Sequence, residues 1–152
     1  MTHELVLELT LDAPKEKLYR CWTEPALLVQ WFAPKPFTTP SAELDVRPGG
    51  SSRIVMRTPD GQDMPSEGVY LEVVPNQKLV FTDAFTAAWQ PRDGAPFMVA
   101  EVTFEDAANG QTRYRAVARH WSAEAKAQHE AMGFHQGWTA CAKQLEELAR
   151  TL

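Results

Sequence analysis

Cysteine is scarce in this sequence, and long apolar runs are missing. Cys21 and Cys141 are the two cysteines, and neither belongs to a Cys-x-x-Cys pair or a Cys/His metal spacing. Structural zinc and a secreted disulfide framework are therefore excluded, and we expect two reduced, mostly buried thiols in a cytoplasmic protein. No apolar stretch approaches the roughly 18 residues of a membrane span. Residues 1–4 lack the basic region of a signal peptide, so we expect neither membrane insertion nor secretion.

An excess of positive charge is also missing. The 15 Lys and Arg residues against 20 Asp and Glu give a net charge of −5, and the basic residues are scattered. This balance argues against a nucleic-acid partner. The apolar share of 44% and the charged share of 23% are ordinary for a folded protein. The length of 152 residues predicts one domain over 1–152 with a sizeable core.

The N-terminal region predicts a strand and two short helices. Leucines alternate with polar residues over 4–11, which is typical of a strand with one buried face. Pro14 suits the first turn of a following helix. A second short helix begins near Pro25, and Pro34 and Pro36 end it.

Residues 41–121 predict an antiparallel meander. Runs rich in β-branched and aromatic residues alternate with turn signals, of which Asp60-Gly61 and Asn109-Gly110 are typical of hairpins. The predicted strands are 42–47, 52–58, 66–74, 78–86, 97–105 and 111–121. No helical pattern separates them, so consecutive strands pair antiparallel.

The C-terminal region predicts one long helix. Its apolar stripe comprises Phe134, Trp138, Cys141, Leu145, Leu148 and Leu152. Ser122 is a candidate cap for a helical stretch over 123–132, and Gly133 is a candidate break. The sheet and the long helix each present one apolar face. We therefore predict an α+β fold in which a curved antiparallel sheet of about seven strands wraps around the C-terminal helix, with the two short helices closing one end.

Four pieces of the sequence, in this order, resemble the heat-shock protein 90 ATPase activator-like family. The first piece is 14–25, followed by Leu28, Trp31-Phe32 and Pro34, and the second is the turn 45–50. The third is the hairpin formed by 68–75 and 79–82, and the fourth is the last helix, which includes Gly137-Trp138. The resemblance runs from about residue 3 to residue 152. It implies the START-like (SRPBCC, helix-grip) superfamily. Domains of that superfamily have a strand, two helices, six strands and a long helix, and many hold an apolar cavity between sheet and helix.

What the resemblance implies about function is broad. The superfamily includes lipid and sterol carriers, hormone receptors, cyclases and chaperone cofactors. The eukaryotic chaperone activator has an additional N-terminal domain that makes much of the chaperone contact, whereas this sequence begins at the predicted first strand. The family name is therefore a poor guide to activity. We expect a domain that binds a small apolar or amphipathic molecule. A cyclase- or hydrolase-like enzyme using the same cavity and a chaperone accessory or stress-response protein are the alternatives, and a homodimer stays open.

The candidate ligand-binding residues are those expected around that cavity. They are Phe81, Asp83, Phe85, Trp89, Met98, Tyr114, Ala116, Ala118, His120, Phe134, Trp138 and Cys141. Ala116 and Ala118 stand where a core strand usually has Val or Ile, so they leave room opposite the long helix. That room is a cavity, unless large neighbours such as Phe134 or Trp138 fill it.

Three of these candidates have a structural alternative. His120 either orients a ligand or acts as acid or base, or it is a hydrogen-bonded histidine at a strand end. Asp83 either binds a polar ligand group, or it meets solvent or an arginine where the strand twists. Trp89 either covers the cavity or packs under its own loop.

The sequence predicts no metal site, cofactor or catalytic residue. His129 and His135 are six residues apart, which does not align two ligands on one helix face, and Gly133 interrupts them. Ser122 has no nucleophile-elbow motif around it. Gly49-Gly50 lacks the Lys-Ser/Thr and the helix of a phosphate loop. Because few polar residues are expected to point inward, binding is favoured over catalysis.

Overall fold

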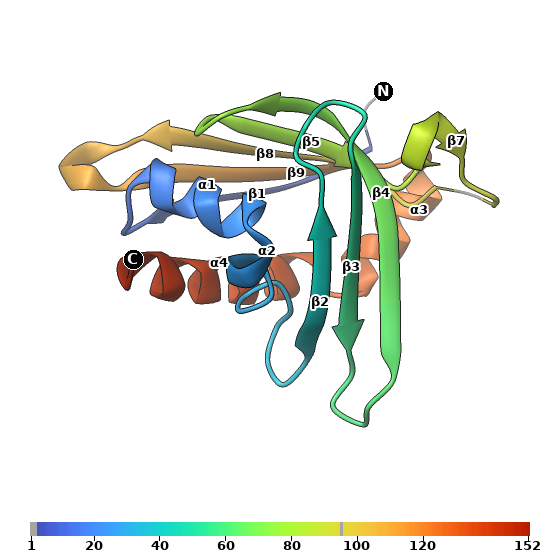
Figure 1. Cartoon of the computed structure of the whole chain (residues 1–152), viewed down its shortest axis with the longest axis horizontal. Helices are drawn as coiled ribbons and strands as arrows, with labels where there is room; N and C mark the ends of the chain where they lie inside the picture. The colour runs from blue at the N-terminus through green and yellow to red at the C-terminus, as the bar shows by residue number, and fades with distance from the viewer. Residues whose placement is uncertain (1–2, 95) are drawn as a thin grey trace.

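The computed structural model describes residues 3–94 and 96–152 (Figure 1). β1 (Glu4–Leu11) leads into α1 (Lys15–Thr23) and α2 (Pro25–Leu28). The remaining strands are β2 (Thr38–Leu44), β3 (Ser51–Arg57), β4 (Asp63–Val74), β5 (Lys78–Thr82), β6 (Phe85–Thr86), β7 (Gln90–Pro91), β8 (Val99–Asp106) and β9 (Thr112–Arg119). Short 3-10 turns, η1 (Ala87–Trp89) and η2 (Ala108–Gly110), precede β7 and β9. The helices α3 (Ala123–Ala131) and α4 (Phe134–Arg150) end the chain.

The main sheet has seven antiparallel strands in the order β1-β9-β8-β5-β4-β3-β2. β2, β3 and β4 cross the direction of β8 and β9, so the sheet is strongly curved, and α4 runs along its inner side (Figure 1). α1 contacts α2, α4 and β8, and α2 contacts β2. This is the predicted helix-grip arrangement, and its α+β class is confirmed. No helix in the described residues is long and apolar enough to cross a membrane.

The core forms between the inward side chains of the sheet and the apolar stripe of α4. On β9, Tyr114, Ala116 and Ala118 are fully buried, while Arg113 is exposed. Inner residues of β1 and the stripe of α4, including Leu145, belong to the same cluster. The inward face predicted for β9 is therefore buried, and Val117 on the arginine face is buried as well.

Several predicted strands have other bounds in the structure: 42–47 is replaced by β2 over 38–44, 111–121 shortens to 112–119, and 78–86 is interrupted. The stretch 78–86 leaves the main sheet after Thr82, and the chain then forms the separate two-stranded ribbon β6-β7. The carboxylate of Asp83 accepts hydrogen bonds from the backbone N–H groups of Phe97 and Met98, which lie just ahead of β8. A side chain thus takes the place of a ladder bond at this point, which ends the pairing.

The predicted helix signals hold at the C-terminal end. The Ser122 hydroxyl accepts a hydrogen bond from the Ala125 N–H at 3.1 Å and caps α3. Gly133 has a φ of 94° and stands at the start of α4. Only glycine adopts that conformation without strain, so the chain can turn sharply between α3 and α4.

Gln144 links the segment after α2 (residues 29–37) to the long helix α4. Its amide nitrogen donates to the carbonyl oxygens of Trp31 and Ala33 at 2.9 and 2.8 Å. Its amide oxygen accepts from the Lys35 N–H at 3.1 Å. One side chain therefore satisfies three backbone groups of a segment that has no ladder of its own.

Replacing Gln144 with alanine is expected to lower the free energy of unfolding by about 1–3 kcal/mol, because it leaves backbone groups without partners. Urea denaturation measures the change. Gln136→Ala is the matched control, since Gln136 is exposed on the same helix. Equal stabilities for the two variants would contradict the fastening role of Gln144.

Candidate functional site

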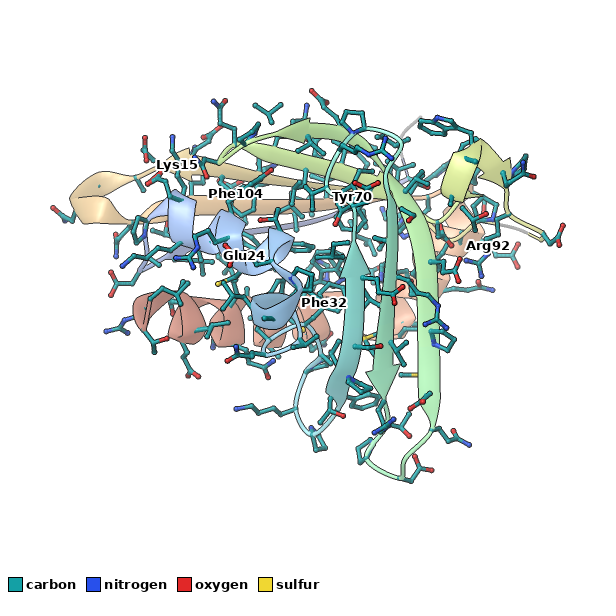
Figure 2. The ribbon with its side chains drawn as sticks, viewed as in Figure 1. Lys15, Glu24, Phe32, Tyr70, Arg92 and Phe104 are labelled. Carbon is teal, nitrogen blue, oxygen red and sulfur yellow. The ribbon has the colours of Figure 1, made fainter. Side chains whose placement is uncertain are left out.

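A pocket of about 400 Å³ lies between the inner face of the sheet and α4. α1 and the segment after α2 form another wall, and the pocket is partly open to solvent. Its lining consists of Trp22, Trp31, Phe32, Pro34, Ser52, Ile54, Met56, Ser66, Glu67, Gly68, Phe81, Thr82, Asp83, Phe97, Met98, Tyr114, His129, Gly137, Trp138 and Cys141. Phe32, labelled in Figure 2, lies where side chains crowd between the sheet and α4. The surface offered to a ligand is mainly apolar and aromatic.

The structure brings half of the candidate ligand-binding residues to this pocket. Phe81, Asp83, Met98, Tyr114, Trp138 and Cys141 line it. They come from β5, the connection to β8, β9 and α4. These elements are distant in sequence and meet only because the sheet curves around the helix.

Of the other candidates, four are buried away from the pocket. Ala116 and Ala118 are fully buried, and Phe134 is 2% exposed in the same core cluster. The space beside the two alanines is thus packed core. His120 is also buried, and it reaches the pocket only through its neighbour His129.

The last two candidates, Phe85 and Trp89, lie in the β6-β7 ribbon and its connecting turn. The rings of Phe85 and Trp89 pack edge to face, with centroids 5.6 Å apart. Trp89 also covers Gly49 and is half exposed. Trp89 therefore packs between Phe85 of its own loop and the turn at Gly49, and it is not part of the pocket lining. Arg92, labelled in Figure 2, follows on the same projecting ribbon.

Sequence reasoning missed the wall formed by α1, the segment after α2 and β3. Trp22 and Trp31 fall in the two short predicted helices, at spacings that give each helix an apolar face. Their centroids are 4.9 Å apart, and both rings also border the pocket. On β3, Ile54 and Met56 are only half-buried. The alternation Ser52, Ile54, Met56 against two arginines was the available signal for this inner face.

Asp83 holds the rim of the pocket in place. Its carboxylate accepts from the Phe97 N–H at 2.8 Å and from the Met98 N–H at 3.1 Å, and it pairs with Arg92 at 3.4 Å. Phe97 and Met98 both line the pocket. The arginine contact proposed for Asp83 as its structural alternative is present, and the carboxylate lies at the pocket wall as well.

Several polar atoms of the lining are already engaged. The indole N–H of Trp22 donates to the Tyr114 hydroxyl at 3.2 Å, and the Thr82 hydroxyl donates to the Met98 carbonyl at 2.8 Å.

Burial raises the pKa of Tyr114 and raises that of the Cys141 thiol to about 12. Both groups are protonated at neutral pH, and the thiol is therefore not an activated nucleophile. Cys21 and Cys141 are free cysteines.

A pair of buried histidines adjoins the pocket. His120 Nδ1 lies 2.9 Å from the carbonyl oxygen of His3, and His120 Nε2 lies 2.8 Å from His129 Nδ1. The ring of His129 packs between Phe97 and Phe134, with centroids 4.5 and 5.1 Å away. Burial, with His120 adding a smaller effect, lowers the pKa of His129 from 6.5 to about 4. The described residues contain no group of three metal-ligating side chains.

Comparison with known proteins identifies the family of this chain. The family model described as activator of Hsp90 ATPase homolog 1-like protein matches residues 12–150. The chain belongs to this family. The resemblance seen in four pieces of the sequence is thereby confirmed for the activator-like domain. No curated protein matches the chain.

Solved structures show the same fold as this activator-like domain. Protein NE0264 from Nitrosomonas europaea is 38% identical, with a TM-score of 0.92 over 97% of this chain and 94% of that one. Protein Ms6760 from Mycobacterium smegmatis is 25% identical, with a TM-score of 0.81 over 97% and 90%. An AHSA1-like protein from Aeromonas hydrophila, 16% identical with a TM-score of 0.73 over 97% and 92%, shares the fold.

Replacing Asp83 with alanine is expected to speed amide exchange at Phe97 and Met98 by about tenfold or more, since a hydrogen bond to a charged group contributes about 1.5–3 kcal/mol. Hydrogen exchange followed by NMR measures the rates. Asp93→Ala is the matched control, because Asp93 is exposed on the same connection. Unchanged exchange in the Asp83 variant would rule out its role at the rim.

Acid is expected to destabilise this family member through His129. Between pH 6.5 and about 4 the unfolded chain binds a proton at this residue and the folded chain does not. The free energy of unfolding therefore falls as the pH falls through that window, and this contribution is constant above it. Urea midpoints at both ends of the window measure the loss, which should be smaller in His129→Phe. An equal loss in the variant would contradict the assignment.

Proposed function

We propose that this activator-like domain binds a small apolar or amphipathic molecule in the pocket between the sheet and α4. The observation that carries the proposal is the pocket itself. Its volume of about 400 Å³ falls in the range of roughly 300–1,000 Å³ that is typical of ligand sites. Because the pocket is partly open to solvent, its apolar walls face water when no ligand is bound. A bound apolar molecule removes those walls from water, and this is the driving force we propose.

The lining indicates how such a ligand is held. Flat aromatic rings of Trp22, Trp31, Phe81 and Trp138 border the pocket on several sides. Aromatic faces provide a large contact area with few rotatable bonds, so ordering them on binding costs little entropy. Shape and apolar burial then determine most of the affinity. The charged groups Asp83 and Glu67 also belong to the lining, but Asp83 accepts from backbone N–H groups and Glu67 pairs with Arg53 at 3.3 Å.

Binding is better supported than a cyclase- or hydrolase-like reaction. Nucleophilic catalysis needs a nucleophile within hydrogen-bond reach of a base. Among the described residues, no hydrogen bond joins Cys141 to a histidine or carboxylate, and burial keeps that thiol protonated. Asp83 is occupied by backbone N–H groups at the rim.

The test is a titration with Nile red, a neutral apolar dye whose emission rises in an apolar site. We expect saturable binding of one dye per chain. Ile54→Trp should weaken it at least about tenfold, because the larger side chain occupies the pocket next to a half-buried wall position. Val6→Trp is the matched control, since Val6 is 38% exposed on β1 and is not part of the lining.

Native mass spectrometry of the purified chain, followed by solvent extraction, then identifies any molecule that the protein retains. Circular dichroism establishes that both variants are folded. Dye binding of equal strength in Ile54→Trp and Val6→Trp would refute the proposed location of the site.

A further inference from the structure

The hydrogen-bond chain through His3, His120 and His129 determines where the imidazole protons lie. The carbonyl oxygen of His3 only accepts hydrogen bonds, so His120 Nδ1, 2.9 Å away, carries a proton. In a neutral imidazole the other nitrogen is then an acceptor. His120 Nε2 therefore accepts the proton of His129 Nδ1 at 2.8 Å. The remaining nitrogen, His129 Nε2, is left with a free lone pair.

No acidic side chain among the described residues compensates a positive charge on this histidine pair. His120 and His129 are each 7% exposed, and neither pairs with a carboxylate among the described residues. A positive charge at either ring would be desolvated without compensation. The lowered pKa of His129 agrees with this lack of compensation.

The His129 residue borders the pocket. His129 is part of the lining, and its Nε2 makes no hydrogen bond to the described residues. Thr39 Oγ1 is the one fully buried side-chain N or O atom without a partner in the described part of the chain. His129 Nε2 is therefore not fully buried, and we infer that its open side faces the pocket that the residue lines. An acceptor in an apolar site selects a donor, because an unpaired polar group there is costly.

We propose that His129 Nε2 is the polar anchor of the pocket and that the ligand is an apolar molecule bearing an O–H or N–H donor, such as a phenol. This rests on the proposed ligand-binding function. His120 acts as a positioning residue: the His3 carbonyl fixes its tautomer, which in turn fixes the tautomer of His129. The anchor thus accepts a hydrogen bond and does not donate one. A ligand that offers only an ether or carbonyl oxygen at this position leaves the lone pair unpaired.

Thymol and its methyl ether test this choice, because they differ chiefly in the donor. Displacement of Nile red gives both affinities. We expect thymol to bind about tenfold more tightly than the ether, in line with the usual contribution of one hydrogen bond. In His129→Phe, which keeps a ring between Phe97 and Phe134, the preference should disappear while the ether binds as before. His135→Phe is the matched control, since His135 is exposed on α4.

A second measurement reads the tautomers directly in the unmodified protein. Nitrogen-15 NMR of the imidazoles should show Nδ1 protonated and Nε2 unprotonated in both His120 and His129. In His120→Phe, which removes the positioning bond, His129 should no longer be held in that form. A protonated Nε2 at His129 in the wild type would overturn the inference.

The outcomes separate the two proposals. If neither Nile red nor either probe binds, the proposed function fails and the inference fails with it. If both probes bind the wild type equally, or the preference persists in His129→Phe, only the anchor role fails.

Discussion

The pocket depends on one constraint, the bend of β4 where it passes from one partner strand to another. β4 pairs with β3 over residues 63–69 and with β5 over residues 69–74, and its register with β5 shifts between Tyr70 and Glu72. At this point Gly68 approaches the carbonyl of Thr82 so closely that a Cβ atom would lie 2.3 Å from its oxygen. Only glycine permits that approach. The crossing of β2–β4 over α4 follows from this bend (Figure 1).

The bend divides the inner face of the sheet into a packed part and an open part. On β9 the inward side chains, such as Ala116, are fully buried against α4. On β3 the inward Ile54 and Met56 are only half-buried, because the sheet there turns away from the helix. A curved sheet cannot contact a straight helix along its whole length, so the space lies where the two surfaces diverge. Aromatic side chains from α1 and the segment after α2 narrow that space without filling it.

The periodicity of the sequence was enough to predict the fold, and it was not enough to predict the site. Alternation over 4–11 and the stripe from Phe134 specify which faces are buried, and the resemblance specifies how they meet. Position along a strand does not say how far the opposite surface lies. Ala116 and Ala118 therefore looked like cavity residues and are core, whereas Ile54, which the sequence placed only within the strand 52–58, borders the pocket. The bend at Gly68 that separates these cases is a tertiary feature.

The histidine pair shows a different limit of local reasoning. His120 and His129 are nine residues apart in the sequence, on β9's end and on α3, and no metal or catalytic spacing relates them. They meet because Ser122 caps α3 directly after the strand and turns the helix back over the strand end. The backbone carbonyl of His3, delivered by the neighbouring β1, then determines the proton positions of both rings. Two hydrogen bonds that begin at the His3 carbonyl thus determine whether His129 accepts or donates a hydrogen bond in the pocket. Apolar walls bind apolar ligands of many different structures. A lone pair of fixed direction is therefore what gives such a pocket its selectivity.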